Sequence, residues 1–112
     1  MKIAIASEGS TMDSMVAERF GRCPFFLILD EEGNLEESMS NEATKASHGA
    51  GGMAVQSIAA KGAKALIAPR LGPNATMALK ASGISAYEAS GCTCSEALEK
   101  FRKGSLKEIP LG

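Results

Sequence analysis

The second half of the chain alternates segments of helical and of strand character, and this alternation restricts the fold more than any other feature. Apolar residues recur at helical spacing or form short buried runs, and a glycine stands where each helix should stop. The predicted helices cover residues 53–61, 73–83 and 93–104. The predicted strands between them cover residues 63–69 and 84–90. Such an alternation predicts parallel strands joined by right-handed helical crossovers.

The first half of the chain predicts a meander of three strands. They cover residues 2–7, 25–30 and 35–40. The full order is therefore β-β-β-α-β-α-β-α, which predicts an α/β protein of three layers with a mixed five-stranded sheet and a ribonuclease H-like topology. The first strand is expected at the centre. The last residues, 105–112, are expected to be loose, with the alternative that Ile109 and Leu111 dock on the core. A length of 112 residues fits a single domain, 1–112.

Composition excludes several classes of function. The chain is 45% apolar and carries 12 basic and 13 acidic residues, for a net charge of −1. This balance indicates no nucleic-acid partner. Because there is neither an apolar run near 18 residues nor a cleavable signal pattern, we expect no membrane association and a cytoplasmic location. Three cysteines without a secretion signal favour free thiols or metal ligands over disulfides.

Four glycine-, proline- or cysteine-bearing segments are expected to meet at one edge of the sheet. In the predicted topology, each of these segments is joined to a strand end at that edge. Ligands of open α/β sheets bind outside the carboxyl ends of the strands. The segments are the long loop 8–24, HGAGG (48–52), PRLGPN (69–74) and SGCTC (90–94). The composition of loop 8–24 favours a mobile segment, such as a lid over a ligand.

The residues of this edge predict an anion site with metal ligands. Glycines at 49 and 51 allow close approach of the backbone, and three helix N-termini would point at one place. The predicted ligand-binding residues from these loops are His48, Gly49, Gly51, Gly72 and Asn74. The predicted metal ligands are His48, Cys92 and Cys94, because imidazole and thiolate suit transition metals. Two alternatives stay open. The histidine could be a polar surface residue without a ligand, and the two cysteines could stand close in the sequence by chance without forming a metal site.

Four motifs in order resemble the dinitrogenase iron–molybdenum cofactor biosynthesis family, which includes NifX- and NafY-like proteins and the C-terminal portion of NifB-like proteins. They are MKIAIAS with VAERFGRCPFF, HGAG, GPNA with ALKA, and GCTCSEAL, spanning Met1 to about Leu106. The resemblance implies a ribonuclease H-like fold and a cytoplasmic, non-catalytic carrier. Its cargo would be an iron–molybdenum cofactor or an iron–sulfur cluster precursor, and its partners would be the proteins that donate or accept the cargo.

The resemblance also bears on individual residues. It supports His48 as a ligand, and the block FGRCP makes Arg22 a cofactor-binding candidate and Cys23 a metal-ligand candidate. Cys23 has the alternative of being simply buried. Two departures stand out: Arg19 occupies a position that is histidine in many relatives, and the Cys92 segment is more sulfur-rich than usual.

Two other functions compete with the carrier. A ribonuclease H-like nuclease needs two metal ions held by several carboxylates, yet residues 2–7 contain no aspartate and residues 53–60 contain no acid. A small phosphate- or nucleotide-binding module with no metal cargo is the stronger alternative. It would use the helix starts and Arg70, and would leave the cysteines without a role.

Overall fold

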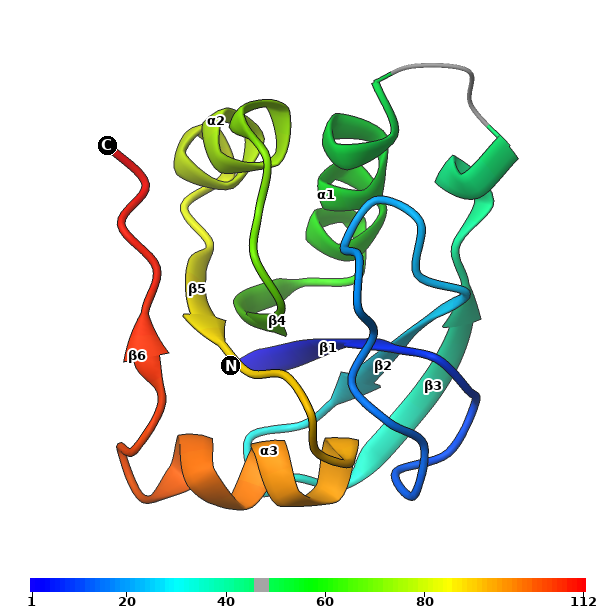
Figure 1. Cartoon of the computed structure of the whole chain (residues 1–112), viewed down its shortest axis with the longest axis vertical. Coiled ribbons are helices and arrows are strands. Elements are labelled where there is room, and N and C mark those ends of the chain that lie inside the picture. The colour runs from blue at the N-terminus through cyan, green and yellow to red at the C-terminus, as the bar shows by residue number, and fades with distance from the viewer. Residues whose placement is uncertain (46–48) are drawn as a thin grey trace.

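A computed structural model describes residues 1–45 and 49–112. Within these residues there are six strands, three α-helices and one short 3-10 helix, whose arrangement is drawn in Figure 1. The strands are β1 (Lys2–Ser7), β2 (Phe25–Leu29), β3 (Leu35–Ser40), β4 (Ala63–Ala68), β5 (Ser85–Glu88) and β6 (Lys107–Glu108). The helices are η1 (Glu42–Lys45), α1 (Ala50–Ala60), α2 (Pro73–Ser82) and α3 (Cys94–Arg102).

The sheet is mixed and has the order β3-β2-β1-β4-β5-β6. Strand β1 is central, runs antiparallel to β2 and parallel to β4, and β4 runs parallel to β5. This arrangement confirms the predicted ribonuclease H-like topology. The prediction of five strands was wrong by one, because β6 adds an antiparallel edge to β5 through residues 107 and 108.

The sixth strand forms because the chain after α3 turns back along the sheet edge. The Ile109 backbone N–H donates to the Ala86 carbonyl at 2.8 Å, and the side chains of Ile109 and Leu111 pack on the core. An unpaired edge of β5 would leave its backbone groups without partners, so even a two-residue strand has a role. The tail is therefore docked through Ile109 and Leu111, which corrects the expectation of a loose tail and agrees with the stated alternative.

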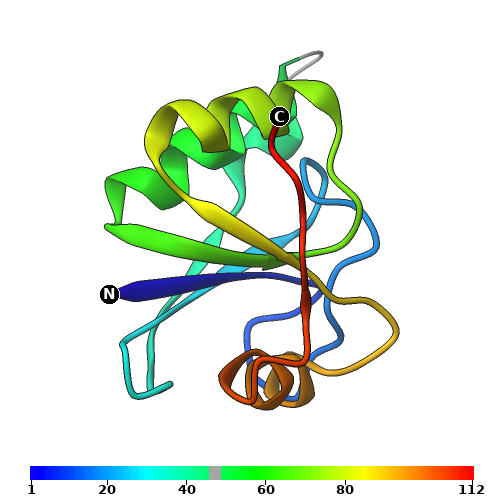
Figure 2. The same ribbon diagram turned by 90° about the vertical axis from the view of Figure 1, so that its left-hand side faces the viewer.

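Helices cover both faces of the sheet, as a three-layer fold requires. Figure 2 shows α1 and α2 on one face and α3 on the other. Alternate residues of β1 serve the two sides: Ala4 and Ala6 belong to the core beneath α1 and α2, whereas Ile3 and Ile5 belong to the core beneath α3. The alternation follows from the two-residue period of a strand. Within the described residues, no helix is long and apolar enough to cross a membrane.

The loops that follow β1, β4 and β5 lie at one end of the sheet (Figure 2). We call this end, with loops 8–24, 69–72 and 89–93, the rim. Loop 8–24 is held there by backbone hydrogen bonds: the Ala17 N–H donates to Ala6, and the Val16 N–H donates to Cys92, each at 2.9 Å. Val16 and Ala17 are buried. The loop is thus part of the packed structure and not a free lid.

Candidate anion-binding site

The rim holds a cavity of about 450 Å³ on the side of the sheet that carries α1 and α2. We call it the rim cavity. Its walls come from loop 8–24, from the first turns of α1 and α2, and from the segment between β4 and α2. The lining residues are Glu18, Arg19, Phe20, Gly21, Gly51, Arg70, Leu71, Gly72, Pro73, Asn74 and Ala75. Its volume lies in the range typical of small-molecule sites.

Two helix N-termini meet in this cavity. Helix α1 begins after Gly49, whose φ of 76° is left-handed, and α2 begins after Gly72. Both N-caps are glycines, so no N-cap side chain bonds to the first N–H groups of either helix. The two first turns touch, because a methyl group on Gly51 would lie 3.2 Å from the Ala75 Cβ. Helix α1 starts three residues earlier than the sequence predicted. The glycine at 51, expected in a loop, is instead the contact that brings the helices together.

The first backbone N–H groups of both helices remain available to a ligand. No described residue accepts a hydrogen bond from the N–H of Gly51, Gly52, Asn74 or Ala75. Unpaired N–H groups and the positive end of the helix dipole attract anions. The first turns of α1 and α2 contain no acidic residue that would already neutralise them. The two helix starts therefore form one electropositive concave surface.

Two arginines add charge to the cavity wall. Arg19 and Arg70 are exposed and line the cavity from different loops, and neither makes an ion pair within the described residues. One carboxylate, that of Glu18, also lines it. A guanidinium binds oxyanions through a planar fork of donors. The side-chain charge of the lining is thus positive.

The N-terminus of α3 does not contribute, which corrects the expectation of three converging helix starts. The Cys94 N–H donates to the Ser14 carbonyl at 2.8 Å, and the Ser95 N–H donates to Met12 at 2.9 Å. The Glu96 N–H donates to the Thr93 hydroxyl at 3.1 Å in the predicted capping box, which is confirmed. These N–H groups have partners already, and α3 lies on the other face of the sheet.

A buried asparagine fixes the loop that forms one wall of the rim cavity. The Asn41 Nδ2 donates to the carbonyls of Cys23 at 2.9 Å and Gly21 at 3.2 Å, and its Oδ1 accepts from the Ala43 N–H at 3.1 Å. Gly21 in turn approaches α1 so closely that a methyl group on it would lie 3.2 Å from the Gly51 nitrogen. Asn41 therefore positions the loop against the start of α1.

Two candidates from the FGRCP block lie outside the cavity lining. The Arg22 guanidinium donates to the carbonyl of Thr44, a residue of η1, at 2.9 Å. Cys23 is 1% exposed in the core beneath α1 and α2, and burial raises the pKa of its thiol to about 12. A thiol with this pKa is almost wholly protonated near neutrality, whereas metal ligation needs the thiolate.

The Cys-x-Cys pair lies in the core layer of α3, across the sheet from Cys23. Cys94 is fully buried, and burial raises its pKa although a hydrogen bond with Ser7 lowers it. Cys92 is 7% exposed and lines a separate cavity on the α3 side. The structure therefore gathers Gly51, Gly72 and Asn74 in the rim cavity and leaves the cysteines outside its lining.

His48, the predicted imidazole ligand, lies outside the described residues. Its chain neighbour Gly49 is described and is the N-cap of α1. Within residues 1–45 and 49–112, no group of three or more histidine, cysteine or acidic side chains is arranged to hold a metal ion.

The three thiols differ in burial, and we expect their reactivity to differ accordingly. Brief treatment of the native protein with iodoacetamide at pH 8 should modify Cys92 first. Cys23 should resist, because with a pKa of about 12 only about one thiol in ten thousand is ionised at that pH. Peptide mass spectrometry measures the order, and Cys92→Ser serves as the control. Equal rates at Cys23 and Cys92 would contradict the burial described.

Sequence reasoning undervalued the residues that charge and shape the cavity. Arg19 was noted only as a lost histidine, and Arg70 only for the alternative function. Asn41 was not singled out, since a lone asparagine after a strand is ordinarily a turn residue. The available signal for the arginines was their place in loops at the carboxyl ends of strands.

Fold and cavity together define a class: a small α/β protein of ribonuclease H-like topology with an electropositive pocket at the carboxyl rim of its sheet. The chain belongs to the dinitrogenase iron–molybdenum cofactor family, whose model matches residues 1–104. The resemblance found in the motifs is thereby confirmed. No curated protein matches the chain.

Solved structures of similar proteins share this fold. The apo form of the orange protein from Desulfovibrio gigas is 34% identical, with a TM-score of 0.91 over 96% of this chain and 92% of that one. A NifB-like protein from Thermotoga is 42% identical, with a TM-score of 0.83 over 96% and 91% of the two chains. A protein described as a dinitrogenase from Methanocaldococcus jannaschii, 21% identical with a TM-score of 0.70 over 97% and 94%, shares the fold.

Proposed function

We propose that this protein binds an anionic metallocluster in the rim cavity and carries it during iron–molybdenum cofactor biosynthesis, without catalysing a reaction. The cargo would be the iron–molybdenum cofactor or an iron–sulfur precursor, exchanged with donor and acceptor proteins. The observation that carries the proposal is the meeting of two uncapped helix N-termini with Arg19 and Arg70 in one cavity. Membership of the family supplies the class of cargo.

The cavity suits a cargo that must be released again. Backbone N–H groups and guanidinium groups hold an anion by charge and hydrogen bonds and form no covalent bond with it. The wall is also fixed before binding, because Asn41 ties loop 8–24 in place. A preformed site spends less of its binding free energy on ordering the chain.

His48 is proposed as the metal ligand of this site. The proposal rests on its position in the sequence, directly before the N-cap of α1. A neutral imidazole is a good ligand for iron and other transition metals. Coordination by one side chain would add to the electrostatic contacts and still permit transfer.

Anaerobic reconstitution tests the function. Addition of iron and sulfide, or of isolated iron–molybdenum cofactor, should give stoichiometric colour with charge-transfer bands that remain after gel filtration. His48→Ala should weaken retention and shift the bands, because a metal ligand is replaced. Transfer of the cluster to an acceptor protein without chemical change would support a carrier. Absence of stoichiometric binding in the wild type would refute the proposal.

Variants of the two cysteines distinguish a cluster bound by Cys92 and Cys94 from a cluster bound in the rim cavity. If Cys92 and Cys94 ligate the cluster, as their pattern in the sequence suggests, the bands should disappear in Cys92→Ser/Cys94→Ser. If the cluster occupies the rim cavity, the bands should persist in that variant and respond to His48→Ala. The cavity lining favours the second outcome, because neither cysteine belongs to it.

A phosphate- or nucleotide-binding module remains the second candidate, because the same N–H groups and arginines would bind a phosphate. Thermal denaturation separates the two. Stabilisation by phosphate compounds, together with no response to any cluster, would favour the module over the carrier.

A further inference from the structure

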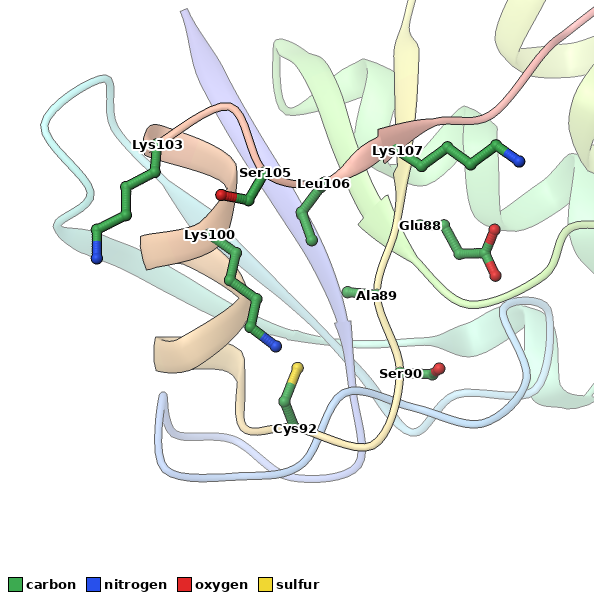
Figure 3. Close-up of a pocket in the computed structure, with 9 residues that line it drawn as sticks. All are labelled: Glu88, Ala89, Ser90, Cys92, Lys100, Lys103, Ser105, Leu106 and Lys107. Atoms are coloured by element: carbon green, nitrogen blue, oxygen red, sulfur yellow. The ribbon is translucent and has the colours of Figure 1, made fainter.

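A second cavity, of about 760 Å³, lies on the α3 side of the sheet (Figure 3). We call it the α3 cavity. It is formed by the end of β5, the loop that leads to α3, the last turns of α3 and the segment that enters β6. Its lining residues are Glu88, Ala89, Ser90, Cys92, Lys100, Lys103, Ser105, Leu106 and Lys107. None of them lines the rim cavity.

The α3 cavity is basic although the whole chain carries a net charge of −1. Three lysines and one glutamate line it. Two of the lysines have acidic neighbours: the Lys103 ammonium pairs with Glu99 at 2.9 Å, and Lys107 lies opposite Glu88 in the β5–β6 register. The remaining lysine, Lys100, therefore decides whether a positive charge is available to a ligand.

Lys100 makes no ion pair within the described residues. Its neighbour one turn earlier, Glu96, uses its carboxylate to accept from the Thr93 N–H at 2.9 Å and from the Thr93 hydroxyl at 3.1 Å. Figure 3 shows the Lys100 side chain extending toward Cys92 across the cavity. The hydrogen bonds from Thr93, and after them the charge of Lys100, lower the pKa of the Glu96 carboxyl, but the Lys100 ammonium forms no ion pair within the described residues and faces the cavity.

The rest of the wall is apolar or weakly polar. Ala89 and Cys92 are buried, at 6% and 7% exposure, and Leu106 is half-buried and points into the space in Figure 3. Leu106 directly precedes β6, which is held by its pairing with β5 and by the bond from the Ile109 N–H to the Ala86 carbonyl. The cavity therefore combines a fixed apolar wall with one ammonium, that of Lys100, which forms no ion pair within the described residues.

We propose that the α3 cavity is a second binding site, separate from the rim, for a small organic anion that carries an apolar group. The apolar group would pack on Ala89 and Leu106, and the anionic group would bind the Lys100 ammonium. Pockets of this volume that join apolar walls to a few polar groups are typical ligand sites. Inorganic anions alone would leave the apolar wall unused, so they should bind more weakly.

Titration with phenyl phosphate, followed by the amide signals in nuclear magnetic resonance spectra, tests the proposal. The amides of Cys92 and Leu106 should shift in a saturable manner, at lower concentrations than with inorganic phosphate or with phenol. Lys100→Gln should weaken this binding about tenfold, because a charge-assisted hydrogen bond is lost. Lys64→Gln is the matched control, since Lys64 is exposed on β4 and lines neither cavity.

The amides of Gly51 and Asn74 report the rim cavity in the same spectra. Shifts of these two amides that do not change in Lys100→Gln would show separate binding of the probe in the rim cavity. The amides of Cys92 and Leu106 alone decide whether the α3 cavity binds it. No saturable shift of those two amides would overturn it. So would equal binding of phenyl phosphate and inorganic phosphate, or equal effects of Lys100→Gln and Lys64→Gln.

Discussion

The double variant Arg19→Gln/Arg70→Gln should bind the metallocluster about 100-fold more weakly than the wild type. Both guanidinium groups line the rim cavity, and neither is engaged in an ion pair within the described residues. Their loss would leave the helix N-termini and the proposed ligand His48 to hold the cluster. The effect should shrink as salt is added, because exposed charges are screened. Anaerobic titration, followed by the charge-transfer bands, measures it.

Two controls make this result specific. Lys61→Gln/Lys64→Gln removes the same charge at the opposite end of β4 and should leave the affinity unchanged. Glu18→Gln removes the one carboxylate of the cavity lining and should strengthen binding modestly. Affinity of the arginine variant within twofold of the wild type would place the cluster elsewhere on the molecule.

Asn41→Ala should lower the free energy of unfolding by about 2–4 kcal/mol. Asn41 is 4% exposed. The substitution leaves the Gly21 and Cys23 carbonyls and the Ala43 N–H without their partner in a buried position. Buried polar groups without hydrogen bonds are costly, and the deleted side chain also leaves a cavity. Chemical denaturation of the apoprotein measures the change.

The same residue type gives a matched control. Asn34 lies exposed in the turn between β2 and β3, where its Nδ2 donates to the Asp30 carboxylate at 3.2 Å. Asn34→Ala should cost less than about 1 kcal/mol, because water replaces the lost partner. Asn41→Ala should also weaken cluster binding through the loosened Gly21 wall. A loss of stability no larger than that of Asn34→Ala would contradict this role.

Local rules account for the parts of the fold that were predicted correctly. The capping box of Thr93 and Glu96 spans one turn, and the helix stop at Gly83 needs only a left-handed residue, here with φ of 70°. The strand β1 was predicted to the residue, because a short apolar run after one polar residue leaves few alternatives. Strand direction then placed the following loops at one rim.

Long-range packing decided what the sequence left open. The start of α1 moved to Ala50 because Gly51 packs on Ala75 of the next helix. The tail became β6 because β5 offered an open edge. Both contacts join residues that are far apart in the sequence, so a local periodic pattern does not predict the start of α1 or the pairing of β6.

By itself the sequence determined the layered α/β fold, the central first strand and the common rim, because periodicity and glycine stops act over single turns and strands. Only the tertiary structure decided which rim groups share a cavity. It joined the starts of α1 and α2 with Arg19 and Arg70, and it satisfied the start of α3 with carbonyls of loop 8–24. Tertiary packing places α1 and α2 on one face of the sheet and α3 on the other. Cys92 and Cys94 lie with α3 and are therefore separated from the rim cavity.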